Sequence, residues 1–320
     1  MIVAILVLMF CFLILAFISE WVERKVVARA QSRVGPLFTG PKGFLQPIAD
    51  FIKLMLKEEI NPIGADRLLL TIIPIISATM FMFTLFFIPI WGTYGYLNLP
   101  GDLIFLLGIS AIFGGLIIIT GYSNPGPYSN IGAARYGELF ISYEVPFVLS
   151  AAAPAIIAGT ITLGEIVEYQ CYSGIILGLF APIGLLVMFL STMSKLERVP
   201  FDVGEAETEI AAGWQVELSG RRLAFYRLAL NLELIFGVGL IVTLYLGGPI
   251  GVFLFEPLWL SCTMWFFIKF FTVLIIVSVF EALMARFRID QVLNIFWKYI
   301  TPLAIFQVIL SFIVKYYFVL

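Results

Sequence analysis

Long apolar runs separated by shorter polar segments set the pattern of this chain. Eight runs are long enough to cross about 30 Å of hydrocarbon as helices, at residues 2–19, 68–91, 103–122, 139–161, 174–193, 225–246, 258–280 and 300–318. The apolar positions are continuous rather than alternating, which favours helices over barrel strands. The pattern therefore predicts an all-α integral membrane protein with eight transmembrane helices, forming a single polytopic domain over residues 1–320.

Basic residues predict the orientation, because the loops after the second, fourth and sixth spans contain none. By the positive-inside rule, the loops at about 20–67, 123–138, 194–224 and 281–299 face the cytoplasm. Both termini then face outward from the inner or plasma membrane. The first run has no basic segment before it and no small-residue cleavage site after it, so we expect it to be retained as a span.

The first cytoplasmic loop contains an amphipathic segment, GFLQPIADFIKLMLKEE, which begins at Gly43. Its apolar positions recur at helical intervals, at Phe44, Ile48, Phe51, Ile52 and Met55. We expect an interfacial helix here, lying along the membrane surface rather than crossing it.

Composition agrees with a membrane protein and excludes several kinds of site. Hydrophobic residues make up 61% of the chain and charged residues only 12%. The net charge of −2 gives no reason to expect a nucleic-acid partner. Three scattered cysteines and the absence of histidine exclude the usual zinc, iron–sulfur and bis-histidine haem sites, so we expect no catalytic residue, metal or cofactor within this chain. Proton chemistry must then use carboxylates, lysine, tyrosine and water.

Glu144 and Glu233 lie inside predicted spans, and Lys269 is a third candidate for a functional charge there. A charge at the centre of a bilayer costs about 2.5–3.5 kcal/mol on insertion scales, so such residues are usually functional. The alternative is that each side chain lies near a helix end and reaches water. Glutamate is too short to reach far, which favours a functional role for Glu144 and Glu233, whereas the longer lysine leaves both possibilities open.

The most charged stretch, KLERVPFDVGEAETEIAAGWQVELSG, begins at Lys195. If it is helical from Asp202 onward, Asp202, Glu205 and Glu209 share one face and Glu207 points elsewhere. Like charges about 6 Å apart repel by roughly 3 kcal/mol at an effective dielectric near 20, which predicts carboxyl groups that titrate together near neutral pH. The alternative is an ordinary solvated loop, but the many apolar residues within the stretch favour a segment folded back into the protein.

These residues resemble a known family: subunit 1 of respiratory complex I, called the H subunit in bacteria, and its counterpart in energy-converting hydrogenases. The resemblance covers nearly the whole chain. The motifs that carry it are ERKVVARAQSRVGP with LQPIADFIKLMLKE in the first loop, ISYE ending at Glu144, RVPFDVGEAETE from Arg198, and RFRIDQVLNIFWKYITPL from Arg286.

The resemblance implies a subunit at the junction between a peripheral electron-transfer arm and an ion-pumping membrane arm. It implies an ion-coupling path through Glu144, Asp202, Glu205, Glu207, Glu209, Glu217 and Glu233, with Arg135 as a cationic partner and Glu138 and Lys269 as further candidates. It implies docking of the peripheral arm on Glu23, Arg24, Lys25, Arg29, Arg33, Asp50, Lys53, Arg198, Arg286, Arg288 and Asp290. Expected partners are hydrogenase-like or complex I-like peripheral subunits, antiporter-like membrane subunits and lipid, with no nucleic acid.

Departures from the complex I pattern select among three hypotheses. Lys195 and Leu139 stand where complex I sequences typically have glutamate and glutamine, which puts quinone binding in doubt. We therefore expect a ferredoxin-dependent membrane-bound hydrogenase-type assembly, whose partner subunits carry the nickel–iron centre and iron–sulfur clusters. The alternative is the quinone-binding subunit of complex I itself. The third hypothesis is a free-standing carrier or channel that binds a cation.

Overall fold

The computed structural model describes residues 2–174, 176–252 and 256–319, and these form helices and loops with no strand among them. The first half contains α1 (Ile2–Ala30), η1 (Pro41–Gly43), α2 (Gln46–Leu56), α3 (Arg67–Thr84), η2 (Leu85–Phe87), α4 (Asp102–Tyr122), α5 (Pro127–Ala158) and α6 (Leu163–Ser173). The second half contains α7 (Leu177–Phe180), α8 (Pro182–Lys195), α9 (Glu207–Ile210), η3 (Gly213–Gln215), α10 (Gly220–Tyr245), α11 (Leu258–Leu283), α12 (Ile289–Ile295), the π-helical η4 (Phe296–Ile300), α13 (Thr301–Val314) and the π-helical η5 (Lys315–Val319).

Seven helices in the described ranges are long and apolar enough to cross a membrane, one fewer than the sequence predicts. The predicted span at 174–193 instead forms α7 and α8, which meet at Ala181 and Pro182. Proline has no backbone N–H to continue a helix, so it begins α8 rather than lying inside it. The 14 residues of α8 rise only about 21 Å, which is short of the hydrocarbon thickness.

Other predicted boundaries shift because the helices extend past the apolar runs. α1 continues through its charged end to Ala30, and α12, η4 and α13 form one apolar helical stretch that begins at Ile289. α5 begins at Pro127, so most of the predicted loop at 123–138 is helical. Its 32 residues rise about 48 Å, and the first turns extend beyond a 30 Å core.

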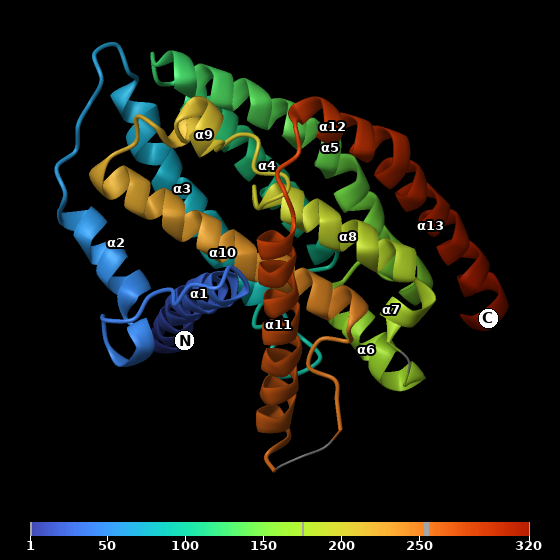
Figure 1. Ribbon diagram of the computed structural model, residues 1–320. Coiled ribbons are helices and arrows are strands. Elements are labelled where there is room, and N and C mark those ends of the chain that lie inside the picture. The colour runs from blue at the N-terminus through green and yellow to red at the C-terminus, as the bar shows by residue number, and fades with distance from the viewer. Residues whose placement is uncertain (1, 175, 253–255, 320) are drawn as a thin grey trace.

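The helix α10 occupies the centre of the bundle and packs against α1, α2, α3, α8 and α11 (Figure 1). Within its most apolar window 89% of residues are buried, against 22% for α1 and 33% for α11. The outer helices therefore present apolar side chains to lipid, whereas α10 is shielded from it. A charged group on α10 is enclosed by protein.

The predicted amphipathic helix is confirmed as α2, which packs on α1 and α10. Phe51 directs its ring at Phe17 of α1, with centroids 5.7 Å apart, and at Phe225 of α10. Phe44 lies just before the helix and contacts Trp21 instead. The apolar face therefore binds this helix to the bundle, while Lys53 and Lys57 stay exposed.

Candidate functional site

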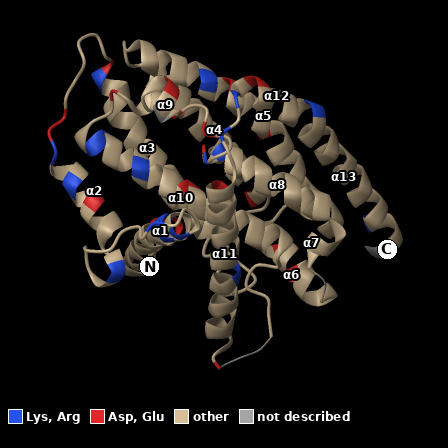
Figure 2. Ribbon diagram, viewed as in Figure 1, with Lys and Arg blue, Asp and Glu red and all other residues tan. Residues whose placement is uncertain are grey.

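A charged cavity of about 630 Å³ lies between the end of α1, the segment after α8, and α10. Five acids and four arginines line it: Glu20, Glu23, Arg24, Arg33, Glu197, Arg198, Glu205, Arg227 and Glu281. Basic and acidic segments gather at this end of the bundle, whereas α11 is mostly uncharged along its length (Figure 2). The cavity therefore lies at the end of the molecule that the sequence predicts to be cytoplasmic.

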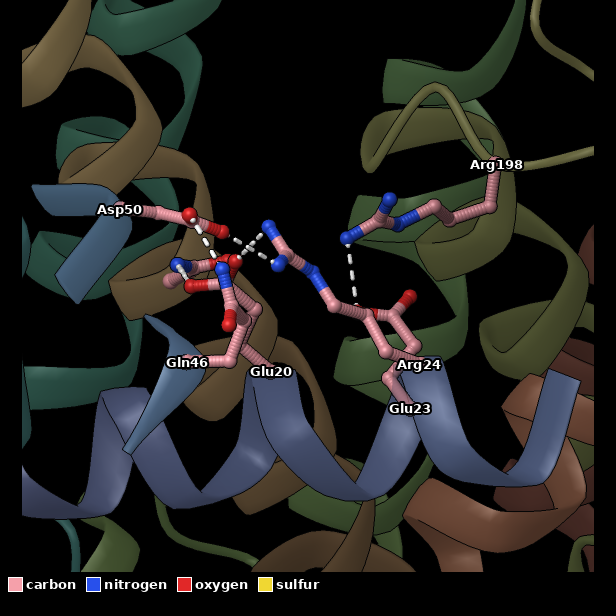
Figure 3. A network of polar contacts seen from close by, with 7 residues as sticks. Glu20, Glu23, Arg24, Gln46, Asp50 and Arg198 are labelled. Carbon is pink, nitrogen blue, oxygen red and sulfur yellow. Dashed lines mark hydrogen bonds and ion pairs between the residues drawn. The ribbon is translucent and has the colours of Figure 1, made fainter. Parts of the chain in front are cut away.

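The pair of Arg198 and Glu23 joins the acidic loop to the first helix. A terminal guanidinium nitrogen of Arg198 lies 2.9 Å from Oε2 of Glu23, which is buried (Figure 3). Glu281 of α11 lies close enough to Glu23 for the two carboxyl groups to interact. Burial lowers the pKa of Arg198, but the charges of Glu23, Glu281 and Glu205 outweigh this effect and raise it above its ordinary value. Arg198 is thus a fixed positive charge of the cavity, beside the other three arginines that line it.

A second network ties α2 to α1 beside the cavity (Figure 3). Arg24 pairs with Glu20 on the same helix and with Asp50 of α2, at 2.7 Å. Gln46 donates to the other oxygen of Asp50, and Asn231 of α10 donates to Glu20 at 2.6 Å. The conformation of one wall of the cavity is therefore fixed by charged hydrogen bonds.

The acidic loop is not the amphipathic helix that the sequence suggests. Only Glu207–Ile210 is helical, so Asp202, Glu205 and Glu209 do not share a face. Asp202 pairs with Arg286, Glu209 with Arg135, and Glu205 accepts a hydrogen bond from Gln215. The predicted shared helical face is wrong because the segment is not helical from Asp202 onward, and Glu209 lies apart beside Arg135. Asp202 and Glu205 remain close enough for their charges to interact. The side chain of Glu207 lies outside the described part of the structure.

Burial is the largest cause of the expected titration near neutral pH, and the predicted repulsion between like charges comes second. Burial and the nearby charge of Asp202 raise the pKa of Glu205 to about 7. Burial also raises the pKa of Glu197, and the charge of Glu205 adds to that rise. Glu197 is held in place by Trp214, whose indole N–H donates to Oε2 at 3.0 Å. Enclosure by protein, rather than helical spacing, holds protons on this loop.

A buried ion pair continues inward from the cavity. Nζ of Lys195, at the end of α8, lies 3.4 Å from Oε2 of Glu144 on α5 and 3.3 Å from the carbonyl oxygen of Ser110 on α4. It also lies over the ring of Phe147, 4.8 Å from the centroid. On the same helix as Glu144, the hydroxyl groups of Tyr136 and Tyr143 lie 3.1 Å apart, both buried.

Glu233 lies near the middle of α10 and is only 1% exposed. Both of its carboxyl oxygens are buried, and no hydrogen-bond partner serves either one within the described ranges. The alternative that it reaches water at a helix end is therefore wrong. Its carboxyl group lies close enough to Lys195 and Glu144 for electrostatic interaction, so these three groups form one inner cluster.

Lys269 does not join this cluster. Its Nζ donates to the carbonyl oxygens of Leu246, Gly248 and Ile250, at 2.7, 3.0 and 2.6 Å. These carbonyls follow the last residue of α10, at the end opposite to the cavity. A cation beside the carboxyl end of a helix is a stabilising arrangement, so the contacts of Lys269 are those of a structural cap.

The remaining predicted residues are spread over the charged end. Glu217 lies beside Gly126 and Glu138 is exposed on α5. Arg135, Arg286, Arg288 and Asp290 line a smaller cavity of about 250 Å³ with Glu209. Lys25 donates to the carbonyl oxygen of Pro36, and Arg29, Arg33 and Lys53 are exposed. The structure therefore groups Glu23, Arg24, Arg33, Arg198 and Glu205 around the larger cavity, apart from the inner cluster.

Four charged residues of the cavity were missed from the sequence: Glu20, Glu197, Arg227 and Glu281. Glu20 and Glu281 directly follow apolar runs, Glu197 lies in the charged stretch from Lys195, and Arg227 lies near the start of a predicted span, so none of them gives a separate signal. Glu20 precedes Glu23 and Arg24 by one helical turn, and that spacing was the available signal. Within the described residues, no group of three or more acidic or cysteine side chains could hold a metal ion.

The fold and the site define a multi-pass, all-helical membrane protein whose buried charges connect one surface cavity to the bundle interior. The family model described as NADH dehydrogenase matches residues 2–312, so the chain belongs to that family, which includes the H subunit of complex I. The complex I part of the resemblance is thereby confirmed.

Individual relatives agree with the family assignment. A Thermomicrobium roseum protein is 36% identical over 315 residues, covering 92% of this chain and 90% of its own length. Relatives from Brevibacillus brevis and Geobacillus thermodenitrificans are 35% and 33% identical, covering 95% and 92% of this chain and 90% and 87% of their own lengths. All three are named as the H subunit of NADH-quinone oxidoreductase, which favours the complex I alternative over the hydrogenase expected from the departures.

Proposed function

We propose that this chain is the junction membrane subunit of a complex I-type NADH-quinone oxidoreductase, in which its charged cavity receives a quinone headgroup. The observation that carries the proposal is the cavity itself, where the part-buried Arg198 pairs with Glu23. Leu196 and Glu197 of its lining directly follow Lys195, which pairs with Glu144 in the inner cluster. The names of the relatives support the same function.

The cavity residues suit a quinone chemically. Nε of Arg198 is buried without a hydrogen-bond partner among the described residues, and a guanidinium is a suitable donor to a carbonyl oxygen. Val27, Leu196 and Leu230 line the same cavity and supply apolar contact for a ring. Reduction of a quinone consumes protons, and the carboxyl groups of Glu23 and Glu281 lie where they could supply them.

The coupling role follows from the charges around the cavity. A change of charge beside Arg198 alters the electrostatic potential at buried carboxyl groups, and screening by water is weak in the interior. We propose that Glu233 and Glu144 respond by moving protons, and that antiporter-like partner subunits use this change to translocate protons or sodium ions. In this assembly α7 and α8 together form the eighth membrane crossing, both termini face outward, and the arginines around the smaller cavity contact the peripheral arm.

A second candidate is a ferredoxin-dependent hydrogenase-type assembly, and the buried lysine favours it. Complex I sequences typically have glutamate where Lys195 stands, and this lysine pairs with Glu144 within the inner cluster. In either assembly the nickel–iron centre or the iron–sulfur clusters belong to partner subunits.

The test is to purify the assembly through a tag on this chain and to measure two activities. We expect quinone reduction that a quinone-site inhibitor blocks, and that R198Q lowers at least about ten-fold because the cavity loses its fixed donor. Ferredoxin-linked hydrogen evolution without quinone would overturn the proposal in favour of the second candidate. Ion transport by this chain purified alone would instead support the free-standing carrier.

A further inference from the structure

Lys195 is enclosed by residues of two other helices, α4 and α5, although it ends α8. It is 2% exposed, and its Nζ contacts α4 at the carbonyl of Ser110 and α5 at Glu144. The rings of Phe147 and Tyr143 cover it at 4.8 and 5.5 Å. A cation held over aromatic faces and beside a carboxylate remains charged at moderate cost.

The second carboxyl group, Glu233, approaches from α10. A Cβ atom on Gly237 would lie 2.7 Å from Cγ2 of Thr192, so α8 and α10 are closely packed at that point. Glu233 is one turn from Gly237 on the same face of α10, and Lys195 is one turn from Thr192 on α8. The close approach therefore brings Glu233 towards Lys195, while its two oxygens find no partner in the described ranges.

Counting charges gives the resting state of this cluster. Two carboxylates beside one ammonium would leave a net negative charge in an apolar interior, and no carboxylate would leave the ammonium unpaired. One carboxylate and one protonated carboxyl group balance the charge. Glu144 has the contact with Nζ, so it is the ionised group, and the unpartnered Glu233 holds the proton.

We propose that Lys195 is a positioning residue that restricts the inner cluster to a single exchangeable proton, by pairing with whichever of Glu144 and Glu233 is ionised. This inference rests on the proposed function, because that function supplies the charge change that moves the proton. In the transfer an O–H bond of Glu233 breaks and one forms on Glu144, and no electrons are exchanged. The flexible stem of Lys195 then carries Nζ from Glu144 to Glu233.

Other titratable groups near the cluster belong to two elements. Tyr136 and Tyr143 lie on α5, and Glu197 and Arg198 follow directly after α8. Electrostatic interaction with these groups changes when the cavity changes its charge. These groups make the choice of protonated residue, Glu144 or Glu233, depend on the charge of the cavity. Lys195 fixes how many protons the cluster holds.

The experiment uses the purified, reconstituted assembly and infrared difference spectroscopy of carboxyl groups during turnover. Relative to the wild type, E233Q should remove the protonated-carboxyl signal. E144Q should remove it too, because Glu233 then ionises to pair with Lys195 and one carboxylate signal remains. K195Q should convert the Glu144 carboxylate signal into a second protonated-carboxyl signal and lower ion translocation per electron about ten-fold, whereas K195R should restore most of it. The exposed Lys298, changed to glutamine, is the matched control and should leave the signals unchanged.

Two results would overturn the inference. One is a Glu144 carboxylate signal that persists in K195Q, and the other is an E233Q variant that removes no protonated-carboxyl signal. The second result needs no lysine variant, so it decides the question even if K195Q does not assemble. Quinone reduction is measured on the same samples, and its absence in the wild type would reject the proposed function instead.

Discussion

The buried Lys195 and the half-buried Lys269 occupy opposite ends of the bundle and have different chemical surroundings. Lys195 lies among a carboxylate, two aromatic rings and one carbonyl, close to a second buried carboxyl group. Lys269 donates to three backbone carbonyls at the end of α10, and these contacts include no acid. Lys269 interrupts an apolar run, whereas Lys195 begins the most charged stretch of the chain.

The difference teaches that the partners of a buried charge, rather than its presence, indicate its role. Backbone carbonyls cannot exchange protons in the physiological range, so the contacts of Lys269 can only hold structure. Carboxyl groups can exchange protons, so the contacts of Lys195 can also change with the state of the cavity. Substitutions at the two ends of the bundle test this distinction between structural contacts and contacts that can exchange protons.

The largest effect is expected from R198Q. It leaves the buried carboxyl groups of Glu23 and Glu281 without their cation, and breaking such a pair costs about 3–5 kcal/mol. We expect a large loss of assembled complex and a lower denaturation midpoint. R221Q is the matched control, because Arg221 is 66% exposed and lies 3.8 Å from Glu59. Equal losses of assembled complex in R198Q and R221Q would show that the Arg198–Glu23 pair stabilises the protein no more than an exposed pair does.

K269Q should destabilise the protein without uncoupling it. Three carbonyl oxygens lose their charged donor, which costs about 2 kcal/mol. The measurements are the denaturation midpoint and ion translocation per electron in the surviving complex. We expect K269Q to lower the denaturation midpoint and to leave ion translocation per electron normal. K195Q, in contrast, should lower ion translocation per electron. An uncoupled K269Q complex would place Lys269 in the ion path and remove the distinction between the two ends.

A smaller effect is expected in the pH dependence of stability. Glu205 has a pKa raised to about 7, above its ordinary value, so the folded state binds a proton that the unfolded state has released. Stability from this group is fully present below the ordinary pKa and is lost as pH rises to about 7. We expect the denaturation midpoint to fall by about 3 °C between about pH 5 and 7.5 and to level off above that.

The control for this titration is E205Q, which cannot ionise. Its midpoint should depend less on pH over the same interval, with the remaining slope due largely to Glu197. An unchanged slope would show that Glu205 titrates normally in the folded protein.

The smallest effects are expected at the surface pairs of the acidic loop. Glu209 is 48% exposed beside Arg135, and exposed pairs contribute at most about 1 kcal/mol. Asp202 is more enclosed beside Arg286, so D202N should lower the midpoint more than E209Q does. Equal midpoints would contradict this ranking of the two pairs by burial.

The sequence predicts the membrane class, the approximate spans, α2 and the buried position of Glu233, because each depends on local apolar pattern. It fails at the break before α8, where Pro182 divides a run whose hydropathy is continuous. The number of spans is predicted from hydropathy averaged over many residues. Such an average is insensitive to the single backbone N–H group that Pro182 lacks.

Sequence reasoning also misses how the charged end is assembled. Glu23 and Arg198 are 175 positions apart, and Arg198 also interacts with Glu281 on a third element. Spacing along one helix cannot reveal such pairs, and it suggested a shared helical face for Asp202, Glu205 and Glu209 that the structure does not form. Tertiary contacts, which no local pattern encodes, decide where these side chains lie.

The central claim is that Glu233 and Glu144 couple the cavity to ion movement. The most direct test is the ratio of ions translocated to electrons transferred in reconstituted assemblies carrying E233Q or E144Q. The exposed Glu165, changed to glutamine, is the control. The account predicts that the ratio falls about ten-fold in both variants and stays normal in the control, because an amide cannot carry the proton. A full ratio in E233Q and E144Q would contradict it.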